Sequence, residues 1–143
     1  MIVRSIKTSF FIVCYHWLAL ACASAAPDLG DFTAQSDVGE PGQPSSAHYD
    51  SATQSYQVSG AGKNVWAEND DFNFVWRKVS GDFIIQSRAR LVGAGTEAHR
   101  KMGLMIRSSL DTGSAMISTA VHGDGLTSLQ FRSASAATVE EIK

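Results

Sequence analysis

The sequence predicts an all-β fold, an antiparallel two-sheet sandwich, from three observations. Short segments rich in β-branched and aromatic residues alternate apolar with polar side chains, as strands with one buried face do. Turns rich in glycine, aspartate and serine separate these segments about every ten residues, a spacing typical of sandwiches. Beyond the N-terminal 25 residues, no segment shows apolar residues at helical spacing. The chain of 143 residues is long enough for one domain.

The first 25 residues have the layout of a secretory signal peptide. Arg4 and Lys7 give a positively charged start, an apolar stretch occupies residues 10–21, and small residues follow. The apolar stretch is about 12 residues long, whereas a membrane-spanning helix needs roughly 20, which argues against an uncleaved anchor. We therefore expect residues 1–25 to be removed on export. The mature protein would have no stable membrane span and would be periplasmic or extracellular.

The end of the leader decides whether the mature chain keeps a cysteine. Residues 23–25, Ala-Ser-Ala, fit the small-x-small rule, so cleavage is predicted after Ala25. The alternative is lipoprotein anchoring through Cys22, because "LALAC" resembles a bacterial lipobox. Both cysteines, Cys14 and Cys22, precede the predicted cut. Cleavage after Ala25 therefore leaves a chain without disulfides, whose fold rests on a packed core.

The charge of the chain excludes nucleic acid as a partner. The sequence has 12 basic and 14 acidic residues. Arg4 and Lys7 leave with the leader, so the mature chain has 10 basic residues against 14 acidic ones, a net charge of −4. A nucleic-acid-binding domain instead shows a basic patch and an excess of positive charge.

Residues 26–46 are predicted to form a loop-rich N-terminal segment, because glycine, proline, serine and aspartate dominate there. One short edge strand is expected within it, at residues 32–36. Residues 47–143 are predicted to form the β-sandwich domain. Aromatic and β-branched residues mark its first strands, which are expected at 55–60, 64–66 and 72–79.

The clearest predicted strand follows the Ser-Gly-Asp turn at residues 80–82. Residues 83–93 alternate from one side of the chain to the other, as a strand requires. One face would hold Phe83, Ile85, Ser87, Ala89 and Leu91. The other face would hold Ile84, Gln86, Arg88 and Arg90.

Three further strands complete the predicted domain. They are expected at residues 101–110, 115–122 and 126–132. In the last of these, Leu129 and Phe131 are expected in the core, and the polar residues between them are expected on the opposite face. Val139 and Ile142 are expected to begin another strand, and the sandwich is expected to be truncated at its C-terminus.

Three segments together carry a resemblance to a known family. They are "NVWAENDDFNFVWRKVSGDF", "HRKMGLMIRSSLD" and "HGDGLTSLQFR", in this order within roughly residues 37–132. They resemble the jelly-roll domain of the concanavalin A-like lectin/glucanase superfamily, in the branch often labelled "regulation of enolase"-like. In exported bacterial proteins that branch often precedes a β-propeller of the Tol-type biopolymer-transport kind, which is absent from these 143 residues. The resemblance implies a two-sheet jelly roll with a sugar-binding concave face.

The carboxylates do not support glycoside hydrolysis. This reaction needs two carboxyl groups roughly 5 to 10 Å apart across the scissile bond. Laminarinase-type members of the superfamily supply them from one strand, as Glu-x-Asp-x-x-Glu, and this chain lacks that pattern. Its aspartates stand in turn contexts, where Asp commonly bonds its own backbone. We therefore expect no catalytic residue, and only Glu140 and Glu141 remain for a glycoside hydrolase-like alternative.

The sequence predicts no cofactor, with calcium as the alternative. His48, His99 and His122 are widely separated and lack the spacing of a zinc site. Asp70 and Asp71 are oxygen donors of the kind that calcium prefers, and jelly rolls often hold calcium in Asp-rich loops. The capping of a turn explains these two aspartates equally well.

Polar residues at alternate strand positions are the main candidates for a ligand site. On neighbouring strands they would form a row of guanidinium, amide and imidazole groups, which suits the hydroxyls and carboxylates of sugars. The alternative is a solvated outer face with cross-strand pairs. The candidate residues in this row are Arg88, Arg107, His122, Gln130 and Arg132.

Trp66 is the aromatic candidate for the same site, because a flat ring covers the apolar face of a pyranose. It stands before the loop "AENDD", whereas Trp76 alternates with Phe72 and Phe74 and is expected in the core. A core position is the alternative for Trp66 as well.

Together these features predict an exported, non-catalytic β-sandwich module that binds glycan or serves as an accessory domain. The alternative is a structural or protein-interaction domain of the cell envelope, with an envelope protein as its partner. An exposed Trp or Tyr above a concave Arg/Gln row would favour sugar binding. A filled face would favour the structural alternative.

Overall fold

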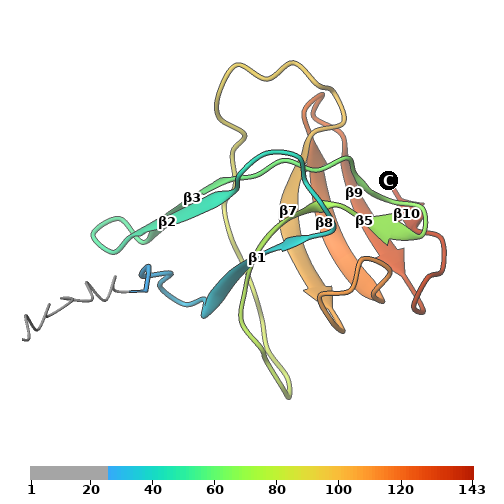
Figure 1. Ribbon diagram of the computed structural model, residues 1–143, viewed down its shortest axis with the longest axis horizontal. Coiled ribbons are helices and arrows are strands. Elements are labelled where there is room, and N and C mark those ends of the chain that lie inside the picture. The colour runs from blue at the N-terminus through green and yellow to red at the C-terminus, as the bar shows by residue number, and fades with distance from the viewer. Residues whose placement is uncertain (1–25) are drawn as a thin grey trace, which may run out of the picture.

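The computed structural model describes residues 26–143, and the regular structure of these residues consists of ten β-strands without a helix (Figure 1). The all-β prediction is therefore confirmed, and the antiparallel pairing is consistent with a sandwich. The predicted signal peptide, residues 1–25, lies outside the described residues. The strands are β1 (Ala34–Val38), β2 (Ser46–Asp50), β3 (Ser55–Ser59), β4 (Val65–Trp66), β5 (Asn69–Asp70), β6 (Phe72–Trp76), β7 (Lys101–Arg107), β8 (Met116–His122), β9 (Thr127–Arg132) and β10 (Glu140–Ile142).

The largest sheet has the strand order β10-β9-β8-β7, and we call it the main sheet. Each strand pairs antiparallel with its neighbour, because short turns reverse the chain between them. The β8–β9 turn closes through the amide of His122, which donates to the carbonyl of Leu126 at 2.8 Å. Gly125 adopts a φ of +92° there, a conformation that costs a glycine little. The main sheet lies at one side of the molecule in Figure 1.

Three two-stranded ribbons make up the rest of the fold, with the pairings β1-β6, β2-β3 and β4-β5. The β2-β3 ribbon lies at the end of the molecule away from the main sheet (Figure 1), where Tyr49 and Tyr56 stack with ring centroids 4.6 Å apart. The β1-β6 ribbon is fixed by Trp76, whose Nε1 donates to the hydroxyl of Ser36 at 3.0 Å. Trp76 is expected in the core from the sequence, but its side chain is only half-buried.

The hydrophobic core joins the β4-β5 hairpin to the main sheet. Val65 of β4, Met116 of β8 and Val139 form a buried cluster, and Phe72 and Met105 pack against it. The face of the main sheet that carries Met105 and Met116 is therefore its inner face. The amide of Val139 donates to the carbonyl of Ala67 at 3.1 Å, which ties the chain before β10 to the same hairpin.

The prediction of which residues of β9 are core is wrong. Ser128, Gln130 and Arg132 are buried on the inner face, whereas Leu129 and Phe131 are only half-buried on the outer face. The alternation itself is correct, since consecutive residues point to opposite sides. Its interpretation fails because the β4-β5 hairpin covers the polar side of the sheet, where Gln130 and Arg132 find hydrogen-bonding partners.

The outer face of the main sheet is apolar and largely open. Cross-strand pairing arranges its side chains in rows, and several of them are exposed, with Ile142 reaching 59%. A contiguous apolar surface of this kind usually marks an interaction site. Two rows run across the strands, one through Ile106, Ile117 and Phe131 and the other through Leu104, Thr119, Leu129 and Ile142.

The predicted strand at residues 83–93 is also wrong. The chain has no strand between Trp76 and Lys101, and its side chains from residue 77 to residue 99 are exposed apart from the half-buried Leu91. A strand needs a hydrogen-bonding partner as well as an alternating sequence, and a β-propensity depends strongly on that context. In the described structure this segment pairs with no strand edge.

At the two ends of the described chain, the predicted strands agree more closely with the structure. The edge strand expected at 32–36 is β1, shifted by two residues, and β2 begins at Ser46, where the loop-rich segment ends. The strand expected near Val139 and Ile142 is β10. Within residues 26–143 no helix is long and apolar enough to cross a membrane.

Replacement of Met116 by Ala tests which side of the main sheet is core. Met116 is 5% exposed, so we expect the cavity to cost about 2–5 kcal/mol of unfolding free energy. Leu129→Ala, on the half-buried outer face, should cost clearly less. Urea unfolding of both variants measures the difference, and a larger loss at Leu129 would contradict the assignment of the inner face.

Candidate functional site

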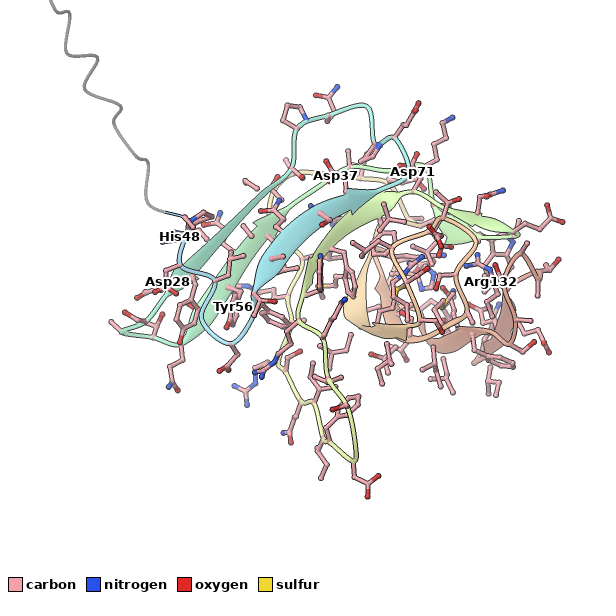
Figure 2. All side chains as sticks on the ribbon, turned by 60° about the horizontal axis from the view of Figure 1, so that its bottom comes forward. Asp28, Asp37, His48, Tyr56, Asp71 and Arg132 are labelled. Carbon is pink, nitrogen blue, oxygen red and sulfur yellow. The ribbon has the colours of Figure 1, made fainter. Side chains whose placement is uncertain are left out.

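The inner face contains a buried ionic cluster formed by Asp70, Arg107 and Arg132. Asp70 Oδ1 lies 2.7 Å from one terminal nitrogen of Arg132, and Oδ2 lies 2.9 Å from the other. Oδ2 is also 3.2 Å from a terminal nitrogen of Arg107. Asp70 and Arg132 are each 1% exposed, so the pair is bidentate and sealed from water. Figure 2 shows Arg132 within the end of the molecule that holds the main sheet.

Strand register explains why these three side chains meet. Arg107 pairs with Met116, and Met116 pairs with Arg132, so the three residues form one row across β7, β8 and β9. Asp70 pairs with Val65 across the β4-β5 hairpin, and both point into the molecule. The carboxylate of Asp70 therefore faces the end of the arginine row.

The surrounding backbone satisfies the remaining donors of Arg132. Its guanidinium donates to the carbonyls of Ala67 at 3.1 Å, Ser114 at 2.9 Å and Ala137 at 2.9 Å. A buried charge is tolerated when it is paired and hydrogen-bonded in this way. The Arg107 side chain is only 2% exposed, and burial lowers the pKa of its guanidinium, partly offset by the neighbouring Asp70. The donors of these arginines are therefore occupied within the chain, and the two side chains join the hairpin to the sheet.

The same cluster removes Asp70 from the calcium ligands considered above. Both of its carboxylate oxygens are already bonded to guanidinium groups. Asp71 keeps an unpaired, buried Oδ1, but in the described part of the chain no group of three His, Cys, Asp or Glu residues is placed to hold a metal ion. The rings of His99 and His122 lie 6.1 Å apart, but Figure 2 shows His48 at the end of the molecule opposite Arg132, so the three histidines do not converge.

A second polar cluster lies at the other end of the inner face, around Lys101. Its ammonium group is 5.2 Å from the centroid of the Trp66 ring, close enough for a cation–π interaction. The same nitrogen donates to Asn64 Oδ1 at 2.8 Å, to the carbonyl of Val65 at 3.1 Å and to Gln130 Oε1 at 3.4 Å. Partial burial lowers the pKa of Lys101. Trp66 is thus held in place while 41% of it stays exposed.

Glu141 extends this cluster along β10. The amide nitrogen of Gln130 donates to Glu141 Oε1 at 2.9 Å, and Lys143 lies 3.4 Å from Oε2. The hydrogen bond from Gln130 is the largest cause that lowers the pKa of Glu141 to about 2. The carboxylate is therefore charged at neutral pH. We call Trp66, Lys101, Asn64, Gln130 and Glu141 the Trp66 cluster.

A polar pocket opens beside this cluster. Its volume is about 370 Å³, and its walls combine amides, carboxylates, a hydroxyl and an ammonium group. Asn69 links the pocket to Trp66, since the two residues pair across the β4-β5 hairpin. Asn64 belongs to both the pocket wall and the Trp66 cluster. The pocket is lined by Gly39, Glu40, Lys63, Asn64, Asn69, Asp70, Asp71 and Thr112.

The structure divides the six site residues predicted from the sequence. It brings Trp66 and Gln130 together through Lys101, and it places Arg107 and Arg132 on Asp70. The other two residues stand apart. His122 is buried with its Nδ1 3.1 Å from the carbonyl of Leu126, and Arg88 is exposed on the segment without a strand.

Sequence reasoning missed Lys101 and Asn64, and it considered Glu141 only as a carboxylate of the hydrolase alternative. Lys101 lies on the same face of β7 as Gly103, Met105 and Arg107, so the alternation of the sequence places it on the same side as Arg107. Asn64 is two residues from Trp66, but its contact with Lys101 joins positions 37 residues apart, and no local pattern predicts such a contact. Comparison of the chain with known protein families, curated proteins and solved structures returned no match. The resemblance to the concanavalin A-like superfamily therefore stays a prediction.

The ionic cluster makes Asp70 the most sensitive polar position of the fold. Asp70→Asn leaves two buried guanidinium groups without a carboxylate, which should cost about 3–5 kcal/mol of unfolding free energy. Arg107→Ala should destabilise the fold less, because Asp70 keeps its bidentate pair with Arg132. Asp82→Asn, at an exposed turn, is the control. Equal unfolding midpoints in urea for the Asp70 and Asp82 variants would contradict this structural role.

The low pKa of Glu141 predicts a loss of stability in acid. Its pKa is about 2 in the folded chain and ordinarily 4.5, so its contribution is present above pH 4.5 and is lost as the pH falls toward 2. Glu141→Gln should flatten this part of the stability profile. Glu140→Gln, at the preceding position of the same strand, is the matched control. Denaturant unfolding between pH 6 and pH 2 measures both slopes, and identical slopes would refute the assignment.

Proposed function

We propose that this chain is an exported, non-catalytic β-sandwich module that binds carbohydrate through the Trp66 cluster. The single observation that carries the proposal is the Trp66 ring, exposed by 41% and held beside a polar pocket. An aromatic ring stacks against the apolar face of a sugar while neighbouring polar groups bind its hydroxyls. The finer prediction of a jelly roll within the concanavalin A-like superfamily agrees with this proposal.

The polar groups next to Trp66 suit sugar hydroxyls. Asn64 and Asn69 offer amides that both donate and accept, and Asp71 offers a carboxylate that accepts. The three donors of Lys101 are already bonded to protein oxygens, so this ammonium group holds Asn64 and Trp66 in position and does not itself bind the sugar. Because these groups are fixed before binding, little conformational entropy is lost when a ligand docks.

The charge states of the nearby carboxylates support binding rather than hydrolysis. A glycoside hydrolase needs an acid that keeps its proton near neutral pH, which requires a raised pKa. Glu141 has the opposite property, with a pKa of about 2. Asp70 is bonded by two arginines and has no free oxygen for a substrate. Neither group is suited to protonate a leaving oxygen.

Trp66→Ala tests the proposal directly. A panel of oligosaccharides built from gluco-, galacto- and mannopyranose units should identify a ligand for the parent chain. We expect the variant to bind that ligand about tenfold more weakly or worse, roughly 1.4 kcal/mol, because a stacking platform is lost. Trp66→Phe should retain most of the affinity, and Val79→Ala, an exposed apolar position outside the cluster, is the matched control. Failure of the parent to bind any oligosaccharide in calorimetry would refute carbohydrate binding.

A structural or protein-interaction role in the cell envelope is the second candidate, and the open outer face of the main sheet favours it. The partner we propose is the same face of a second copy, because its rows are apolar and Glu140 lies only at the margin strand. Strands of seven, seven, six and three residues span roughly 400 Å² per copy, about half of a standard interface, so the dimer should dissociate readily. Light scattering at rising concentration should show a dimer that Ile117→Glu abolishes. A strict monomer at every concentration would refute this candidate.

A further inference from the structure

The free edge of the main sheet is unprotected. In the described residues β7 is the last strand of the sheet and pairs with β8 alone, so alternate amides and carbonyls along it lack a strand partner. Natural sheets usually protect such an edge with a charge, a proline or a bulge. Residues 102–106 of β7 contain neither a charged residue nor proline. This edge is open to an additional strand.

The segment at residues 83–91 has the sequence of a strand and none of its pairing. It alternates apolar and polar residues and is as long as β7 requires. Its apolar side chains are exposed apart from the half-buried Leu91, and Ile84 reaches 95%. Such exposure is costly for a β-branched apolar residue, because burial of apolar area is favourable.

The chain between the two elements can close a hairpin. Gly93 has a φ of +88°, which suits the start of a reversal, and the amide of Arg100 donates to the carbonyl of Glu97 at 3.3 Å. In Figure 1 the segment before β7 runs upward, loops over at the top and returns downward as β7. The two elements therefore already run in opposite directions.

We propose that residues 83–91 close onto the free edge of β7 as a fifth, antiparallel strand of the main sheet. The occupant of the edge is this segment of the same chain. The described structure shows the open arrangement, and docking would satisfy the edge of β7 and the backbone of the segment together.

Charge selects one register for the docked strand. With Arg90 opposite Gly103 and Arg88 opposite Met105, neither arginine faces a cation. A shift of two residues in one direction places Arg90 opposite Lys101, and a shift in the other direction places Arg88 opposite Arg107. Like charges directly opposite each other destabilise a strand pair.

The same register matches the two faces. Leu91 comes opposite Met102 and Ala89 opposite Leu104, so the apolar side of the segment continues the outer face of the sheet. The arginines then continue the inner, polar face. A shift of one residue would exchange the two sides and place the arginines among the apolar rows.

Hydrogen exchange of the full chain tests the docked strand. We expect the amides of residues 83–91 and the edge-facing amides of β7 to be protected together, about tenfold or more relative to an unstructured chain. Arg88→Pro, opposite Met105 in this register, should remove protection from both, since proline cannot donate to the pair. Val79→Pro, outside the segment, is the matched control. Exchange of residues 83–91 at unprotected rates would overturn the proposal.

A cysteine pair tests the register and the identity of the occupant. In a chain with Cys14 and Cys22 replaced by Ser, Ala89→Cys with Leu104→Cys should form a disulfide within one chain under mild oxidation. Arg88→Cys with Leu104→Cys should not, because the two side chains point to opposite faces. Equal yields for the two pairs, or disulfides that form only between chains at rising concentration, would overturn docking within the same chain. Neither test involves carbohydrate, so its outcome is independent of ligand binding at Trp66.

Discussion

The carboxylate of Asp70 holds the two layers of this fold together. It receives a bidentate pair from Arg132 and a further contact from Arg107, at a position sealed from water. The β4-β5 hairpin supplies the carboxylate and the main sheet supplies both arginines, so the hairpin cannot leave the sheet without separating buried charges. The position of Trp66 depends on this arrangement, because Trp66 belongs to the same hairpin.

The sequence predicted the all-β fold class and most strand positions, because alternation and turn residues are local signals. It could not predict which side of β9 is buried. Leu129 and Phe131 have the composition of a core, yet Gln130 and Arg132 are the buried pair. That outcome depends on Asp70, which is 62 positions away from Arg132 in the chain. A local pattern cannot reveal that a distant carboxylate neutralises an arginine.

The candidate site shows the same division. The prediction grouped Trp66 with a row of arginines, and the structure separates the row into a structural end at Arg132 and an accessible end at Lys101. What distinguishes the ends is the partner across the layer, a carboxylate at one and an exposed aromatic ring at the other. The predicted strand at residues 83–93 is absent from the described structure for a related reason, since alternation is a local property and strand pairing is not.

The most direct test of this account is a double-mutant cycle on Asp70 and Arg132. Unfolding free energies are measured in urea for Asp70→Ala, Arg132→Ala, the double variant and the parent chain. The account predicts a coupling energy of about 1.5–3 kcal/mol, because Asp70→Ala leaves Arg132 buried and unpaired, and Arg132→Ala leaves Asp70 only its single contact with Arg107. Additive effects, with a coupling near zero, would show that the two layers are held together by something other than this ion pair.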